Sequence, residues 1–220
     1  MSEPKALETL GFDRYQRFRA AAGLINGLAQ GRGLAILDVG PFDDAFAAFL
    51  PGHRVQGHSG LVRPGSGLPM ADGVAEVVCA LDVLEHVAPP ERAFFLAELA
   101  RVASLAVVLG FPIAPAAAAE EFVWRVTQSP WLAEHRRHGL PEPAEVEAML
   151  DGLGLAWERH PNAALPSWTA MMLLMYGVRE TGLREEISAF FNRRYYELEN
   201  REPAYRYLYL CRKPGRGGDA

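Results

Sequence analysis

The sequence has little cysteine, no long hydrophobic run and no excess of basic residues. Its two cysteines, Cys79 and Cys211, each lie in an apolar run, so we expect buried thiols and no disulfide framework. No segment reaches the roughly 20 apolar residues of a membrane span, and the first residues lack the apolar stretch of a signal peptide. We therefore predict a cytoplasmic protein with no membrane span.

The charge balance argues against a nucleic-acid partner. The formal net charge is -5 over 220 residues, and the pI is about 5.7. Binding to a phosphate backbone needs a basic face, and the pairs 136–137 and 193–194 are too small to provide one. Half of the residues are hydrophobic, which favours one globular domain with a full core.

Apolar runs alternate with helical patterns in the first half of the chain, which predicts an α/β fold with a mostly parallel sheet. Strands are predicted in 34–40, 74–81 and 104–112, and a turn followed by a short strand is predicted in 51–58. Helices are predicted in 15–28 and 89–103, and further on in 141–154, 167–182 and 184–200, with strands at 155–162 and 204–213. Ligands of such sheets bind beyond the carboxyl ends of the strands, so the stretches 40–44, 57–59, 81–86 and 111–112 form the candidate site.

The segment "LPMADGVAEVVCALDVLEHVAPPERAFFLAELARVASLAVVLGFP", residues 68–112, carries an ordered set of motifs. It resembles the core of class I S-adenosylmethionine-dependent methyltransferases of the type 11 group. That group has an L-P-F-x-D-G-x-F-D-x-V loop and strand, a segment like D-V-L-E-H-V, and a helix with L-x-E-x-x-R-V. The matching positions are Leu68, Pro69, Asp72, Gly73, Val77, Asp82 to Val87, Leu96, Glu98, Arg101 and Val102. With "ILDVG" before it, the resemblance covers about 34–112.

The resemblance implies a Rossmann-like methyltransferase fold with an antiparallel last strand, a helical C-terminal cover and S-adenosylmethionine as cofactor. We expect a single domain over 1–220. Its parts would be an N-terminal helical segment (1–32), a cofactor-side core (33–112), a substrate-side cover with one core strand (113–203) and a final strand (204–213).

Three features depart from the family pattern. The usual G-x-G-x-G turn keeps only Gly40, and Phe42 stands where its second glycine would be. The acid that normally ends the second strand and binds the ribose is replaced by His58, whose neutral ring offers one acceptor. Between His58 and Leu68 the chain is too short for the usual helix and third strand. We therefore predict an altered adenine-side pocket.

The turn itself leaves two alternatives open. Either it swings outward or Phe42 fills part of the pocket, because Pro41 restrains Gly40 and removes an N–H donor. Asp43 and Asp44 are typical caps of a following helix. Two carboxylates there oppose a pyrophosphate, which weakens an NAD-dependent oxidoreductase, whereas a sulfonium cofactor tolerates them.

The predicted cofactor-binding residues share positions in or near the turns at the carboxyl edge. They are Asp38, Gly40, Phe42, His58, Met70, Ala71, Leu81 and Asp82. The resemblance implies that the backbone of Leu81 and Asp82 lies near the methionine part of the cofactor. The predicted catalytic residues are His86 and His138; His86 would orient an acceptor or take its proton. The alternative for Glu85 and His86 is a helix cap and a hydrogen bond in the core.

Two further patterns have ordinary structural interpretations. His135 and His138 form an H-x-x-H spacing, which is half a zinc site, so we predict no metal. The stretch 168–176 has Trp, Met and Tyr at helical spacing; core packing is the default, and an apolar lid or a dimer face, with a homodimer as its consequence, is the alternative.

The leading functional hypothesis is methyl transfer from S-adenosylmethionine to a small-molecule acceptor, with sugars and lipid-linked compounds as the classes considered. The main alternative is a catalytically inactive relative that acts as a binding or partner subunit. The altered turn favours this alternative, and the D-V-L-E-H-V segment favours the enzyme.

Overall fold

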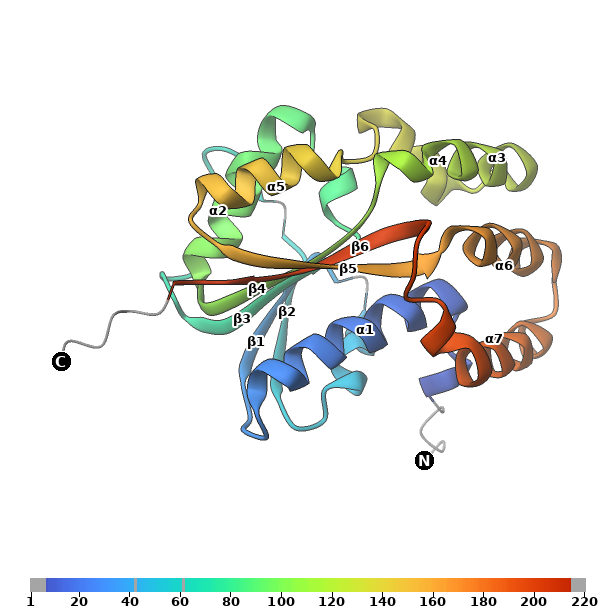
Figure 1. The fold of residues 1–220 in the computed structure, drawn as a ribbon, viewed down its shortest axis with the longest axis horizontal. Helices are drawn as coiled ribbons and strands as arrows, with labels where there is room; N and C mark the ends of the chain where they lie inside the picture. Colours follow the sequence, from blue (N-terminus) through green and yellow to red (C-terminus); the bar gives the residue numbers. More distant parts are fainter. Residues whose placement is uncertain (1–6, 42, 61, 215–220) are drawn as a thin grey trace.

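A computed structural model describes residues 7–41, 43–60 and 62–214 (Figure 1). In this part of the chain, six strands form one sheet in the order β2-β1-β3-β4-β6-β5. The strands are β1 (Ala35–Val39), β2 (Arg54–His58), β3 (Ala75–Leu81), β4 (Ala103–Pro112), β5 (Ala156–Ala164) and β6 (Ala204–Arg212). The α-helices are α1 (Phe12–Ala29), α2 (Arg92–Val102), α3 (Ala117–Thr127), α4 (Pro130–His138), α5 (Pro143–Gly152), α6 (Leu165–Gly177) and α7 (Thr181–Tyr195). The 3-10 helices are η1 (Leu7–Thr9), η2 (Asp44–Phe49), η3 (Leu84–His86), η4 (Pro89–Glu91), η5 (Ala114–Ala116) and η6 (Tyr196–Leu198).

The strand directions confirm the predicted sheet. β1 pairs in parallel with β2 and β3, and β3 pairs in parallel with β4. β6 runs antiparallel to both β4 and β5. The described residues between β2 and β3 form turns and irregular chain, so β2 is an edge strand. This agrees with the prediction that the connection is too short for a further helix and strand.

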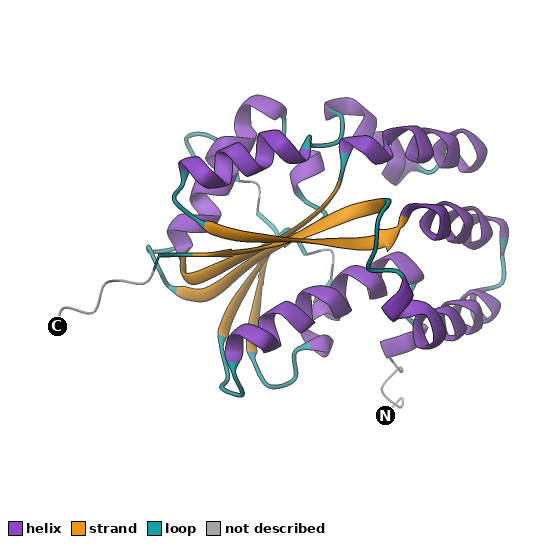
Figure 2. Ribbon diagram, viewed as in Figure 1, coloured by secondary structure: helices purple, strands orange, loops and turns teal. Residues whose placement is uncertain are grey.

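The sheet lies between two helical layers, with more helices beyond its carboxyl edge (Figure 2). Side chains on β3 alternate between the layers, as the pleat of a strand requires. Val77 and Cys79 pack with α1, whereas Val78 and Ala80 pack in the core that includes α2 and α5. Cys79 and Cys211 are buried free thiols, as predicted. Among the described helices, none has the length and apolar character needed to cross a bilayer.

Most of the predicted helices are present with shifted ends. The one that differs in kind follows the β1 turn, where the 3-10 helix η2 replaces a full α-helix. The chain has room for little more, because Pro51 and Gly52 turn it into β2 directly afterwards. The segment 113–138, which the pattern left unassigned, forms α3 and α4.

The loop of the resembling segment is held by the helix that follows it. The guanidinium of Arg101 donates to the carbonyl oxygens of Leu68 and Met70 at 3.0 and 2.8 Å, and to Oδ1 of Asp72 at 2.7 Å. Glu98 accepts from Arg101 and from the backbone N–H of Leu68. These motif residues therefore fix the approach to β3, and they place the end of that strand where the candidate site lies.

Candidate active site

Two adjoining cavities lie beyond the carboxyl ends of β1 and β3. The larger cavity has a volume of about 570 Å³, and the smaller cavity has about 360 Å³. The two share Gly40, Val83 and His86 in their walls. Binding sites for small molecules usually measure about 300–1,000 Å³, so the larger cavity alone is of ligand size.

The larger cavity has mixed walls with more acids than bases. Besides the shared residues it is lined by Asp13, Arg14, Arg17, Phe18, Asp38, Pro41, Asp43, Leu81, Asp82, Trp131, Glu134 and Met172. The smaller cavity has fewer charged side chains, and its other lining residues are Val39, Ser59, Gly60, Val62, Arg63, Val87, Ala88, Glu91, Phe95 and His138.

The turn after β1 forms the boundary between the cavities. Gly40 has a φ of +81°, and a Cβ there would lie 2.7 Å from Cγ2 of Val83. Only glycine fits both the backbone conformation and this close approach. The N–H of Gly40 donates to the carbonyl oxygen of His58 at 2.8 Å, which ties the turn to the end of β2. Phe42 lies outside the described residues, so the predicted alternatives for its ring stay predictions.

Asp43 has the capping role predicted for it. Its Oδ1 accepts the N–H of Ala45 at 3.0 Å, at the start of η2. The side chain also pairs with Arg14, and this hydrogen bond lowers the pKa of Asp43. One acidic side chain of the turn is therefore already engaged in a hydrogen bond and an ion pair within the protein.

Asp38 lies near the end of β1, and its carboxyl group is buried at the wall of the larger cavity. Burial raises its pKa to about 7, although the charge of Arg17 acts in the opposite direction. The site therefore holds a carboxyl group whose charge changes near neutral pH.

Asp82 follows β3 and is fixed by two arginines. Arg206 on β6 donates to both of its carboxylate oxygens, each at 2.6 Å, and Arg17 on α1 donates to Oδ2 as well. Burial would raise the pKa of Asp82, but the charges of Arg17 and Arg206 outweigh it and lower that pKa. Arg206 is fully buried and also donates to Oδ1 of Asp13 at 2.9 Å. Asp82 is therefore ionised, and the two arginines fix it in the wall of the larger cavity.

His86 ends η3 and is the predicted catalytic residue with the most access, since it lines both cavities. Its Nδ1 lies 3.7 Å from Oε2 of Glu134. Burial, followed by the charge of His135, lowers the pKa of His86, which favours the neutral ring. His138 lines the smaller cavity only. Both predicted catalytic histidines therefore line the smaller cavity.

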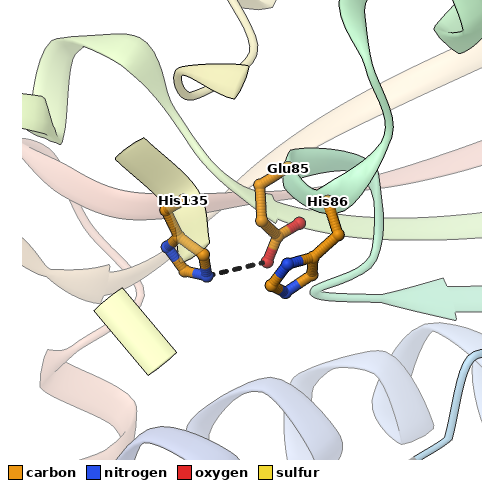
Figure 3. Close-up of side chains that lie close together, drawn as sticks. All are labelled: Glu85, His86 and His135. Carbon is orange, nitrogen blue, oxygen red and sulfur yellow. Dashed lines mark ion pairs between the residues drawn. The ribbon is translucent and has the colours of Figure 1, made fainter. Parts of the chain in front are cut away.

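A buried cluster lies directly behind His86. The rings of His86 and His135 have centroids 5.0 Å apart, and Nε2 of His135 lies 3.8 Å from Oε1 of Glu85 (Figure 3). The other ring nitrogen of His135 lies 3.1 Å from Oε1 of Glu120, whose Oε2 accepts the hydroxyl of Tyr205 at 2.8 Å. Burial and then the charge of Asp82 raise the pKa of Glu85 to about 8. These groups come from η3, α3, α4 and β6.

The structure separates the predicted cofactor-binding residues into two groups. Asp38, Gly40, Leu81 and Asp82 line the larger cavity, and Gly40 lines both. The remaining described ones, His58, Met70 and Ala71, are not among the lining residues of either cavity. Met70 and Ala71 belong to the loop held by Arg101, and the ring of His58 lies over Gly60.

Sequence reasoning missed several residues of the site. They are Asp13, Arg14, Arg17, Glu91, Glu120, Trp131, Glu134 and Arg206. Arg206 gave one usable signal, because it is a charged residue inside an otherwise apolar and aromatic strand. The arginines of α1 gave none, since arginines on a helix are usually solvated. Met172 was assigned to the core or to a lid, and it is buried at the wall of the larger cavity.

Comparison with solved structures identifies the architecture. The plantazolicin methyltransferase BpumL in complex with SAH matches 92% of this chain and 85% of its own, with a TM-score of 0.57 and 10% identity. The CurJ carbon methyltransferase matches 91% of this chain and 55% of its own, with a TM-score of 0.55 and 10% identity. A protein from Bacillus halodurans, whose assignment as a methyltransferase is provisional, matches 88% and 98%, with a TM-score of 0.52 and 18% identity.

The chain has the class I methyltransferase fold. The structural matches extend over most of its length at low identity. No protein-family model matches the sequence, and no curated protein matches it either. The predicted Rossmann-like methyltransferase fold is therefore confirmed at the level of structure.

Proposed function

We propose that the protein transfers a methyl group from S-adenosylmethionine to a small-molecule acceptor. The observation that carries this proposal is the larger cavity, which is of ligand size and opens beyond β1 and β3. Its lining includes five acidic side chains, Asp13, Asp38, Asp43, Asp82 and Glu134, against two arginines in the lining and the buried Arg206 behind it, which pairs with Asp13 and Asp82. A cationic sulfonium is favoured in such surroundings, whereas a pyrophosphate is disfavoured. Structures with the same fold that bind SAH support the choice of cofactor.

The two cavities divide the cofactor between them in this proposal. The adenosine part occupies the smaller cavity, where Val62, Val83 and Phe95 supply apolar surface for an aromatic base. Glu91 also lines this cavity and accepts from the ribose hydroxyls, in place of the acid that is absent at His58. The cofactor passes from one cavity to the other beside Gly40, Val83 and His86, which line both, and its methionine part lies in the larger cavity.

The acceptor occupies the rest of the larger cavity. Phe18, Trp131 and Met172 give this region apolar walls, and His86 is the ionisable group exposed both there and at the adenosine side. An acceptor with an apolar portion and a hydroxyl near His86 fits these walls, and lipid-linked compounds and sugars with apolar substituents belong to this class. Methyl transfer depends mainly on alignment of the nucleophile with the sulfonium carbon, so the walls matter as much as a base.

The catalytically inactive binding subunit is the second candidate function. One observation favours it: the N–H of Gly40 is already bonded to His58, and Pro41 offers no N–H, so this part of the turn has fewer donors for a ligand.

Calorimetry with S-adenosylmethionine and S-adenosylhomocysteine tests the proposal. Ligand at about 100 times its Kd should raise the free energy of unfolding by roughly 2.7 kcal/mol. Val83→Trp, which fills the wall between the cavities, should abolish binding, while the matched control Val74→Trp, on a side chain 58% exposed, should not. Absence of heat with the folded wild-type protein at millimolar ligand would contradict the proposal. Binding without release of S-adenosylhomocysteine across a panel of hydroxylated acceptors would favour the inactive subunit.

A further inference from the structure

Three side chains, one in the wall of the larger cavity and two behind it, have an arrangement that the methyltransferase fold does not explain. Glu85 and His86 come from η3, and His135 comes from α4. Each offers one ligand atom, and these atoms all lie within 4.8 Å of one another. Figure 3 shows the three side chains converging on a common point. We propose that Glu85, His86 and His135 bind a divalent transition-metal ion of the Zn²⁺ class.

The distances suit such an ion. Zinc binds imidazole nitrogen and carboxylate oxygen at about 2.0–2.2 Å, so two ligands of a tetrahedral site lie about 3.4 Å apart. Nε2 of His135 and Oε1 of Glu85 are 3.8 Å apart. That separation is too long for a direct hydrogen bond, and a shift of a few tenths of an ångström brings both atoms onto one ion.

The hydrogen-bond inventory of the cluster gives independent support. Glu85 and His135 are 0% and 1% exposed, respectively. Neither carboxylate oxygen of Glu85 accepts a hydrogen bond from another described residue, and Nε2 of His135 has no partner among them either. Buried polar groups nearly always have partners, because an unpaired one loses its hydration without compensation. A bound cation would satisfy Nε2 of His135 and the ligand oxygen of Glu85 together.

The surroundings of His135 orient its free nitrogen. Its Nδ1 lies 3.1 and 3.2 Å from the two carboxylate oxygens of Glu120. Glu120 is in turn fixed by the hydroxyl of Tyr205. A carboxylate accepts and does not donate, so the proton of the neutral ring is on Nδ1 and the lone pair of Nε2 points toward Glu85. Carboxylate–histidine–metal arrangements of this kind are the usual outer shell of histidine metal ligands.

The ligand types select the class of metal. Two imidazoles and one carboxylate suit zinc and its first-row neighbours, whereas magnesium and calcium prefer oxygen ligands throughout. Three protein ligands leave a coordination position open, as in catalytic zinc sites. His86 lines the larger cavity, and so do Trp131 and Glu134 beside it, which places the open position at the cavity wall.

A role for the ion in catalysis rests on the proposed methyl transfer. An ion at the wall would bind a hydroxyl of the acceptor and lower the pKa of that hydroxyl. Metal binding itself needs neither S-adenosylmethionine nor an acceptor. Failure of the metal site and failure of the methyltransferase proposal are therefore measured separately.

The proposed metal site differs from the H-x-x-H spacing of His135 and His138, from which no metal was predicted. His138 is not one of the three converging residues. The partners of His135 are 50 and 49 residues earlier in the chain, at Glu85 and His86, and a local spacing does not indicate them.

Metal content and calorimetry test the site directly. The full-length protein is stripped with a chelator and titrated with Zn²⁺, Mn²⁺ and Mg²⁺, and metal is counted by mass spectrometry after gel filtration. We expect one equivalent of Zn²⁺, a Zn²⁺-dependent rise in Tm, and visible absorption typical of low-symmetry coordination when Co²⁺ replaces Zn²⁺. Absence of stoichiometric Zn²⁺ in folded protein would overturn the proposal, and stoichiometric Mg²⁺ in its place would overturn the assignment of the class.

Variants localise the ion. Glu85→Gln and His135→Ala should each weaken Zn²⁺ binding by at least about 100-fold, and Glu120→Gln by about 10–100-fold through its effect on His135. His138→Ala and His160→Ala are matched controls that should keep the wild-type affinity. Melting curves of the metal-free proteins show whether each variant is folded. If His135→Ala does not fold, Glu85→Gln still tests the site, because glutamine keeps the shape of the glutamate side chain. Retention of tight binding in folded Glu85→Gln, or its loss in His138→Ala, would overturn the site.

Discussion

The guanidinium of Arg206 binds both carboxylate oxygens of Asp82, through Nε–Oδ1 and Nη2–Oδ2 distances of 2.6 Å each. The two residues are 124 positions apart and connect β6 to the end of β3. Trp168 on α6 joins the same network by donating to Asp13, and its ring stacks on Tyr205 with centroids 3.6 Å apart. The wall of the larger cavity is therefore held from α1, α6 and β6 together.

Replacement of Arg206 by methionine should destabilise the protein strongly. The change leaves the carboxylates of Asp82 and Asp13 without their shared buried cation, and removal of one partner from a buried ion pair costs about 3–5 kcal/mol. Urea unfolding measures the loss. Arg212→Met is the control on the same strand; it removes an exposed pair with Glu158 of β5 and should cost much less. Equal losses in the two variants would contradict the central role of Arg206.

Gly40→Ala should lower both stability and cofactor affinity. The backbone is in the left-handed region, which costs about 1–3 kcal/mol for a residue with a side chain, and the new methyl meets Val83. Gly27→Ala is the control, because it lies in α1 with no heavy atom within 4 Å of its added Cβ. That change should stabilise the protein by about 0.5–1 kcal/mol. Thermal melts measure the stability, and calorimetry with S-adenosylhomocysteine measures the affinity. If Gly40→Ala matched the wild type in stability and in affinity, the turn would be flexible, contrary to this prediction.

Asp38 should make stability fall as the pH rises. The pKa of an unfolded aspartate is about 3.9, and that of Asp38 in the fold is about 7, so the native state binds more protons between these values. The free energy of unfolding therefore decreases across that window, by up to about 1.4 kcal/mol per pH unit. Asp38→Asn should reduce this slope, to which the buried Glu85 also contributes, and be more stable than the wild type at pH 8. Urea unfolding from pH 4.5 to 8 measures it, with the exposed Asp44→Asn as a control that keeps the slope.

Glu91→Gln should weaken S-adenosylhomocysteine binding by about 10-fold, because the ribose would lose charge-assisted hydrogen bonds. The exposed Glu186→Gln is the matched control and should keep the affinity. A dideoxy analogue without the ribose hydroxyls should bind to the wild type and to Glu91→Gln equally well. A 10-fold difference that persists with this analogue would mean that Glu91 contacts another part of the ligand.

The local sequence pattern determined most of the secondary structure of this protein. The alternation of apolar runs and helices predicted the parallel strands, because hydrophobic periodicity and turn residues act over a few neighbours. The short connection after His58 correctly indicated that β2 has no further strand beside it. The segment from Asp82 to His86 was correctly expected at the end of a strand.

The tertiary structure decided which side chains meet at that strand end. Arg206 reaches Asp82 because β6 enters the sheet beside β4, and His135 reaches Glu85 because α4 packs over η3. Met70 and Ala71 instead belong to a loop that Arg101 holds outside the cavities. Such contacts depend on how distant elements pack and on which buried charges need partners, and no spacing within one segment encodes either.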